Sequence, residues 1–319
     1  MFKSLENSIL VSTTNRYLDM IPKDKEYKLI EIYFYVCKKF EKGLKVYCER
    51  FSNNDEPEFT DQEIMTLYLY IMHHEQQFKV KHIHRFASEY LHSWFPELPS
   101  YQAFNNRLNR LSGAFRKLSE DLLADYQPND CCLDQSLLDS MPIITCSGKR
   151  TGKVAREITD KGYNSTKGFY YYGLKLHALG FRRIGKLPHP EQILFTAASV
   201  NDLSLYKQAW SEIKDRVFFG DKIYNNKDFF ADMKAKSNSE MLTPVKGVKG
   251  MSEALKKFDR AANDLYSKAV SRVRQPIESL FNWLIEKSDI QKASKVRSTK
   301  GLLVHAYGRL AVAFITLIF

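Results

Sequence analysis

Cysteine is scarce in this chain, and none of it has a spacing that indicates a disulfide framework or a metal site. The 319 residues include five cysteines, an odd number without a Cys-x-x-Cys pair: Cys37, Cys48, Cys131, Cys132 and Cys146. This pattern argues against a secreted disulfide-rich domain and against a zinc knuckle. The sequence therefore predicts reduced thiols in a cytoplasmic protein.

A long, uninterrupted apolar run is also missing. The most apolar tract is residues 301–319, GLLVHAYGRLAVAFITLIF, which carries His305 and Arg309 and falls short of a clean membrane-spanning length. We expect a buried terminal helix there and no membrane partner. The chain has no internal repeat, and its 44% hydrophobic and 27% charged residues are typical of a globular protein rather than a disordered one.

Acidic residues are few in three stretches, and positive charge is concentrated there. Residues 145–186 hold ten Lys and Arg against two acidic residues, residues 234–274 hold ten against four, and residues 287–309 hold six against one. Clustered positive charge favours a polyanionic partner, because phosphates bound by Lys and Arg release counterions. Each stretch alone could be a solvated basic loop. Three in the same part of the chain favour nucleic acid.

Residues 1–127 have a helical pattern. In FTDQEIMTLYLYIMHHEQQF, Thr60 and Glu63 have capping-box spacing, and apolar residues then recur at helical intervals. A second helix follows from about residue 80, and Ser100 is placed to cap a third, YQAFNNRLNRL. This third helix is compatible with a helix-turn-helix DNA reader, since Arg suits guanine and phosphate and Asn suits adenine, and equally with a plain three-helix bundle. Its candidate DNA-binding residues are Asn105, Asn106, Arg107 and Arg110.

The pattern changes from residue 130 onward. Short runs rich in aromatic and β-branched residues, separated by Gly, Pro and charged loops, are typical of strands: CCLDQSLLDSMPIITC, KGFYYYGLKLHALGF, EQILFTAASV, RVFFGD and EMLTPV. Helices are expected after the third and fourth runs, and a long one over residues 252–287 that breaks at Pro276. The sequence thus predicts an α/β fold over residues 128–319, a mixed sheet flanked by helices, preceded by an all-helical domain over residues 1–127.

Three acidic residues stand where buried elements end or face the interior. Asp139 follows two leucines in SLLDSMPI, and Asp221 follows a short apolar strand in VFFGDKIY. Glu278 borders the apolar stripe of its helix, and Arg274 lies one turn earlier, where it can pair with Glu278. Gly-Asp is common turn chemistry, but strand ends on rigid scaffolds are also where proteins present catalytic groups.

Two other aspartates compete for these roles. Asp134 precedes Asp139 on the same predicted strand, and Asp202 opens a helix, where the N-cap position would explain it. Asp139 is favoured over Asp134 because Ser-x-Pro follows it. Lys175 and His177 are expected to be strand residues that face DNA or the core rather than catalytic groups.

Three carboxylates can converge only if something offsets their mutual repulsion, and a divalent cation does so. Mg²⁺ takes oxygen ligands and is typically held by a few carboxylates together with substrate phosphates. Two ions about 3.5–4 Å apart would activate an attacking oxygen and stabilise the leaving one at phosphorus. We therefore expect Mg²⁺, as two ions and with Mn²⁺ as a substitute, to be bound by Asp139, Asp221 and Glu278.

LLDSMPI, FFGDKIY and RQPIESLFNWL, in this order and spacing, resemble the DDE-type transposases of bacterial insertion sequences. YYYGLKLHALGF and TAASVNDLSL extend the resemblance, which covers residues 130–287. It implies a ribonuclease-H-like catalytic core, with Asp139, Asp221 and Glu278 as the metal-binding catalytic triad, and a DNA-binding helical region before it. Many relatives carry a Tyr three residues before the Arg and a Lys seven residues after the Glu; this chain has Ser271 and Ile285 there.

The resemblance implies an enzyme that cleaves DNA at the ends of its own element and transfers the freed strand to target DNA. Its partners would be the double-stranded terminal repeats, the target DNA and at least a second copy of the chain, at the nucleoid in a bacterial cytoplasm. Lys175, Lys222 and Arg274 join the candidate DNA-binding residues. Two alternatives remain: a catalytically inactive, domesticated regulator that binds DNA, and a host nuclease with the same core but no specificity for element ends.

Overall fold

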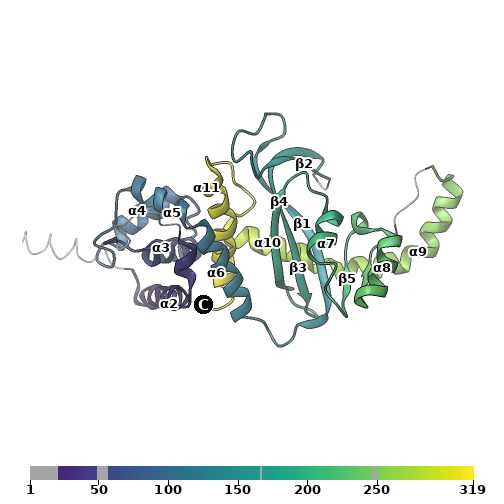
Figure 1. The fold of residues 1–319 in the computed structure, drawn as a ribbon, viewed down its shortest axis with the longest axis horizontal. Helices are drawn as coiled ribbons and strands as arrows, with labels where there is room; N and C mark the ends of the chain where they lie inside the picture. The colour runs from purple at the N-terminus through teal and green to yellow at the C-terminus, as the bar shows by residue number, and fades with distance from the viewer. Residues whose placement is uncertain (1–20, 49–56, 166, 246–249) are drawn as a thin grey trace, which may run out of the picture. The chain divides into compact units, whose positions relative to one another are not determined.

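The computed structural model describes residues 21–48, 57–165, 167–245 and 250–319, and they fall into two compact units (Figure 1). The helical unit comprises the described residues up to 124 together with 287–290 and 300–319, and the sheet unit comprises 125–286 and 291–299. The predicted division of the chain after residue 127 stays a prediction. Its first domain includes residues 1–20 and 49–56, which lie outside the described residues.

The helical unit is built around a helix that is buried on every side. Its elements are α2 (Lys23–Glu41), a 3₁₀ turn (Leu44–Tyr47), α3 (Asp61–His74), α4 (Val80–Tyr90), α5 (Tyr101–Arg110) and α6 (Ser112–Asp125). Every residue of α3 from Ile64 to Met72 is buried. The other helices are amphipathic, and each buries one stripe of apolar side chains.

Two helix starts follow the predicted capping chemistry. The Glu63 N–H donates to the Thr60 hydroxyl at 3.2 Å, and the Thr60 N–H donates to the Glu63 carboxylate at 2.5 Å. The Ala103 N–H donates to the Ser100 hydroxyl at 3.4 Å at the start of α5. The capping box and the Ser100 cap are therefore confirmed, and both satisfy backbone donors that have no partner within the helix.

The apolar C-terminal tract forms α11 (Thr299–Leu303), one turn of π-helix (Val304–Gly308) and α12 (Arg309–Ile315). All seven residues of α12 are buried, so the predicted buried terminal helix is confirmed. A Cβ atom on Gly308 would lie 2.9 Å from Cε1 of Tyr68, so a glycine is needed for this close approach to α3. Among the described residues, no helix is both long and apolar enough to cross a membrane.

The sheet unit contains a mixed sheet of six strands: β1 (Cys132–Ser147), β2 (Asp160–Asn164), β3 (Phe169–Arg182), β4 (His189–Ala197), β5 (Val217–Phe219) and β6 (Glu240–Leu242). The long strand β1 lies between β3, its antiparallel partner, and β5, its parallel partner. On the far side of β5, β6 continues the sheet in parallel, while β2 and β4 both pair with β3. The parallel pair β1–β5 positions the end of β5 beside the middle of β1.

The five predicted strands correspond to β1, β3, β4, β5 and β6. The sixth, β2, was not predicted, because its sequence DKGYN is polar and has no apolar alternation. Its antiparallel pairing with β3 forms the strand, although its own sequence does not favour one. Gly162 lies opposite Tyr171, and a Cβ atom on Gly162 would lie 2.6 Å from the carbonyl oxygen of Ala198.

Helices flank this sheet: α7 (Asp202–Ala209), α8 (Lys227–Ser237), α9 (Glu253–Arg274) and α10 (Pro276–Ser288). Leu138 of β1 packs in one buried cluster with Leu205 and Tyr206 of α7. Because neighbouring residues of a strand face opposite sides, Asp139 faces away from α7. α10 begins at Pro276, so the predicted break is confirmed. The mixed α/β fold, flanked by helices and preceded by a helical region, is confirmed as well (Figure 1).

One buried histidine makes the helical unit sensitive to acid. The Nε2 atom of His305 lies 2.8 Å from the carbonyl oxygen of Ile290. Burial, with the nearby charge of Arg309, lowers the pKa of His305 to about 3. In an unfolded chain a histidine has a pKa of about 6.5, so below that pH the unfolded state binds a proton that the folded state does not. Stability is therefore lost as the pH falls below 6.5.

We expect this residue to reduce the free energy of unfolding by about 2 kcal/mol between pH 7.5 and pH 5, as measured by urea unfolding. His305→Gln should weaken this pH dependence, because glutamine takes up no proton. His92→Gln is the matched control, since His92 is exposed. The same pH dependence in the wild type and both variants would contradict the assignment.

Candidate active site

Asp139 lies in the middle of β1, on the face of the sheet opposite α7. Its side chain is 23% exposed, and its Oδ1 atom accepts a hydrogen bond of 2.8 Å from the Ser140 N–H. Burial raises the pKa of Asp139 to about 6; the charge of Arg274 opposes this effect, and the carboxylates of Asp202 and Asp221 add to it. The strand thus holds a carboxylate that is costly to ionise without a nearby cation.

Asp221 lies directly beyond the end of β5. The parallel register places Leu137 beside Phe219. Asp139 follows Leu137 by two residues, and Asp221 follows Phe219 by two residues. Asp221 is exposed, and its carbonyl oxygen accepts from the Tyr224 N–H at 3.0 Å in a 3₁₀ turn (Lys222–Tyr224). The sheet therefore brings together two carboxylates that are far apart in the sequence.

Arg274 joins the third predicted acid to this pair. Its Nη1 atom donates to Asp139 Oδ2 at 2.5 Å, and its Nη2 atom donates to Glu278 Oε1 at 2.7 Å. The predicted pairing of Arg274 with Glu278 is confirmed. The bond to Asp139, 135 residues away, could not be predicted from spacing. Although burial opposes it, the carboxylates of Asp139, Glu278 and Asp221 raise the pKa of Arg274.

Asp202 has a different role from the one predicted. The N-cap of α7 is Asn201, whose side chain accepts from the N–H groups of Leu203 and Ser204, so the explanation of Asp202 as a cap is wrong. Asn201 is the better cap because it precedes the first helical residue. Asp202 is buried instead, and its Oδ1 atom lies 3.1 Å from Lys175 Nζ.

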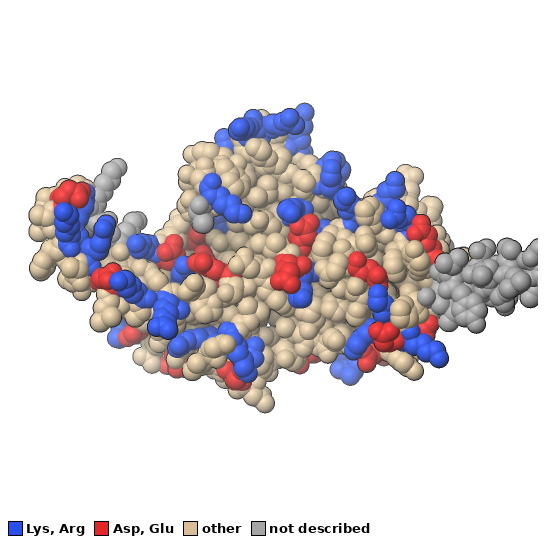
Figure 2. Space-filling view, turned by 180° about the vertical axis from the view of Figure 1, so that it is seen from behind, with Lys and Arg blue, Asp and Glu red and all other residues tan. Residues whose placement is uncertain are grey.

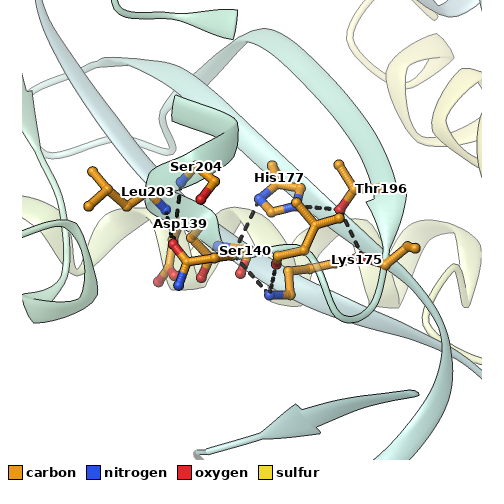
Figure 3. Close-up of polar contacts among 11 residues, drawn as sticks. Asp139, Ser140, Lys175, His177, Thr196, Leu203 and Ser204 are labelled. Atoms are coloured by element: carbon orange, nitrogen blue, oxygen red, sulfur yellow. Dashed lines mark hydrogen bonds and ion pairs between the residues drawn. The ribbon is translucent and has the colours of Figure 1, made fainter. Parts of the chain in front are cut away.

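His177 completes this buried polar group. Its Nδ1 atom lies 3.5 Å from Asp202 Oδ1, and its Nε2 atom lies 2.9 Å from the hydroxyl of Thr196 (Figure 3). Burial lowers the pKa of His177 to about 4, so the ring is neutral at physiological pH. Lys175 Nζ also donates to the carbonyl oxygen of Val200 at 2.7 Å, which ties the start of α7 to β3.

The other predicted residues occupy varied positions. Asp134, the rival of Asp139, is exposed on β1. Lys222 is exposed next to Asp221, whereas Lys175 is largely covered and paired with Asp202. Of the predicted DNA-binding side chains on α5, Asn106 and Arg110 are exposed. Asn105 and Arg107 are partly buried, and Arg107 is bonded to Asp61 at 2.9 Å. Their contacts with DNA, like the catalytic roles, stay predictions.

The described residues contain no group of three His, Cys, Asp or Glu side chains already arranged to hold a metal ion. Asp139 and Glu278 instead share the guanidinium of Arg274. The donor set itself consists of carboxylate oxygens, which are the ligands that hard divalent cations prefer. In chemical type, these residues fit such a cation.

The comparison with protein families decides the identity of this region. A family model described as a transposase DDE domain matches residues 130–299, more than half of the chain. The chain belongs to the transposase DDE domain family. The resemblance to DDE transposases is thereby confirmed, and the mixed sheet with flanking helices is consistent with the ribonuclease-H-like fold of such a domain.

Two further comparisons give little about this transposase DDE domain. No curated protein matches the chain. Among solved structures, the crystal structure of a pre-cleavage Mos1 transpososome is similar over 88% of this chain and 85% of that chain, with 12% sequence identity and a TM-score of 0.18. A similarity of this degree supports no argument about fold or function.

The shared guanidinium leads to a test of stability. We expect Arg274→Gln to lower the free energy of unfolding of the metal-free protein by about 1–3 kcal/mol, because Asp139 and Glu278 lose their counterion. The value is below that of a fully buried pair, since the Glu278 side chain is 54% exposed. Mn²⁺ should restore part of the loss, as measured by thermal unfolding in EDTA and in Mn²⁺.

Arg272→Gln is the matched control, because Arg272 is an exposed arginine two residues earlier on α9. It should change neither the stability nor the response to Mn²⁺. Equal effects of the two substitutions would show that Arg274 is not the counterion of the acidic residues.

Proposed function

We propose that this transposase DDE domain protein is an insertion-sequence transposase that cleaves DNA at the ends of its element and joins the freed 3′-hydroxyl to target DNA. The observation that carries this proposal is the convergence of Asp139 and Glu278 on Arg274, with Asp221 at the end of the strand paired with β1. Membership of the family supports it, since the matched residues include all three acids.

Asp139, Asp221 and Glu278 would hold the divalent cations, two ions of Mg²⁺ or Mn²⁺. When bound, the cations would supply the Lewis acidity that phosphodiester cleavage and strand transfer need. The contribution of the protein is to position the acids. The hydrogen-bonded pair β1–β5 carries two of them, and α10 brings the third, so no protein nucleophile is required.

The DNA partner would be contacted by basic and polar side chains from both units. Lys222 beside Asp221, and Asn106 and Arg110 on α5, are exposed and available for such contacts. Lys175 and Arg274 already have carboxylate partners, so each would have to exchange a partner to bind phosphate. Figure 2 shows Lys and Arg spread over one face with Asp and Glu among them. Pairing two element ends would require at least a dimer.

Asp221→Asn tests the proposed chemistry, because it removes one ligand charge and almost no surface. Losing a group that only hydrogen-bonds to a metal ligand costs about 10–100-fold in activity. We expect the loss of the ligand itself to reduce strand cleavage by more than this, while DNA binding is retained. The substrate is a labelled duplex carrying the sequences that flank the gene, assayed with Mg²⁺, with Mn²⁺ and with EDTA. Asp228→Asn is the control, since Asp228 is an exposed aspartate seven residues away.

Nicking by the wild type at a fixed position that requires metal would support the proposal, whereas cleavage by Asp221→Asn at the wild-type rate would contradict it. Tight binding by the wild type without cleavage under either metal would favour the alternative function, a regulator that binds DNA. Cleavage without a preferred position would favour a host nuclease.

A further inference from the structure

Two of the three basic stretches of the sequence meet at the end of β1, within the sheet unit. Ile144 of β1 forms an isolated parallel β-bridge with Lys292. The Ile144 N–H donates to the carbonyl oxygen of Gln291 at 2.8 Å, and the Ala293 N–H donates to the carbonyl oxygen of Ile144 at 2.9 Å. These bonds place the segment that begins at Gln291 beside the loop that follows β1.

A groove of about 610 Å³ lies between this segment and the loop. Its lining includes three exposed cations, Arg150 and Lys153 of the loop and Arg297 of the segment, together with the hydroxyl-bearing residues Thr151 and Ser294. No Asp or Glu is among the described residues that line it. The groove is therefore positively charged throughout.

The three cations have no acidic partner in the part of the chain that the structure describes. Arg297 Nη1 donates only to backbone carbonyl oxygens, those of Ser294 at 3.0 Å and Val296 at 2.8 Å. Neither Arg150 nor Lys153 forms an ion pair there. Like charges held close together repel one another, so this arrangement favours the binding of an anion from outside.

The loop that carries two of these cations is held firmly against β3. The Gly148 N–H donates to the carbonyl oxygen of Tyr170 at 2.8 Å. An added Cβ atom on Gly152 would lie 2.7 Å from Cδ1 of Tyr172, and one on Gly148 would overlap the backbone of Tyr170. One loop cation lies between these glycines and the other directly follows them, so both extend from a backbone whose position is fixed.

The lining suits the backbone of a nucleic acid better than its bases. Lys, Arg and hydroxyl side chains bind phosphate oxygens, and such contacts position a duplex without reading its sequence. Asn and Gln, which pair with adenine, and Asp and Glu, which pair with cytosine, are missing from the described lining.

The groove and the acidic residues lie along one strand. Thr145, which also lines the groove, follows Asp139 by six residues on β1. At about 3.3 Å per residue, this separation is about 20 Å. It corresponds to about six base pairs of B-DNA, which rises about 3.4 Å per base pair. One duplex can therefore reach both places.

We infer that the groove of Arg150, Lys153 and Arg297 binds the phosphate backbone of duplex DNA without regard to its sequence. This inference rests on the proposed function, in which DNA is the substrate, and adds a contact about six base pairs from the bond that is cleaved. It gives the two basic stretches a role that solvation of a basic loop does not.

The double variant Arg150→Gln/Lys153→Gln tests the inference. The logarithm of the DNA affinity falls linearly with the logarithm of the salt concentration, and each phosphate contact contributes about 0.9 to the slope. We expect the variant to reduce this slope by about 2, equally for two duplexes of unrelated sequence, as measured by fluorescence anisotropy.

Lys234→Gln/Lys236→Gln is the matched control. It removes the same charge from two exposed lysines that are paired with acids, Lys234 with Glu240 and Lys236 with Asp232, and it should leave the slope unchanged. An unchanged slope in the Arg150 and Lys153 variant, an equal reduction in the control, or a reduction for only one duplex would overturn the inference.

Cys146 provides a second readout in the wild-type protein. It lines the groove, whereas Cys132 lies at the other end of β1, and both are partly exposed. A duplex that carries a disulfide tether on one phosphate should react by thiol–disulfide exchange with Cys146 in preference to Cys132, as located by peptide mass spectrometry. Equal or preferential reaction at Cys132 would contradict the inference.

Binding and cleavage separate this inference from the proposed function. If the wild type cleaves no DNA but the double variant has the reduced slope, the proposed function fails and the groove still binds DNA. If the wild type cleaves DNA and the double variant has the wild-type slope, only the inference fails. If the wild type binds no duplex DNA, both fail.

Discussion

The repulsion among carboxylates is the constraint on which the sheet unit depends. Asp139 and Asp221 each lie two residues beyond the paired residues Leu137 and Phe219 of β1 and β5, and Glu278 of α10 shares Arg274 with Asp139. Burial and the neighbouring acids raise the pKa of Asp139 to about 6 although the charge of Arg274 opposes them, so without this cation the group would take up a proton still more readily. Arg274 supplies that cation by donating to two of the three acids.

The rest of the fold brings these groups to one place. Strand alternation directs Leu138 into the core beneath α7 and its neighbour Asp139 to the opposite face. The break leaves one residue, Gln275, between the end of α9 at Arg274 and the start of α10 at Pro276, so Arg274 and Glu278 stay one helical turn apart across it. Buried apolar contacts pack the helices against the sheet. The charged groups lie at the borders of this apolar core.

Much of this arrangement follows from local sequence. Apolar runs predicted the strands, and Ser100 and Thr60 predicted helix starts, because strand burial and capping depend on adjacent residues. The expectation that a strand ends at Asp139 is wrong, since β1 continues through Pro142 to Ser147. Pairing between distant segments could not be predicted in this way. The polar strand β2 exists only through its partner β3, and the bond between Arg274 and Asp139 depends on how α9 packs on the sheet.

Asp202 shows the same limit at the candidate site. An aspartate at the start of a helix is expected to be its N-cap. The structure shows that Asn201 is the N-cap of α7 and that Asp202 is buried and paired with Lys175. The identity of the three candidate acids could be proposed from sequence, because motif order and a family resemblance indicated them. Their electrostatic environment could not, since Arg274 and Asp202, which act on Asp139, come from two other elements, α9 and α7.

The most direct test of this account is anomalous diffraction from crystals of the wild-type protein soaked in Mn²⁺. The account predicts an anomalous peak about 2.1 Å from carboxylate oxygens of Asp139 and Asp221, with Arg274 moved away from Asp139. A Mn²⁺ site elsewhere in the protein, with Arg274 still bonded to both Asp139 and Glu278, would contradict the claim that these acids form the cation site.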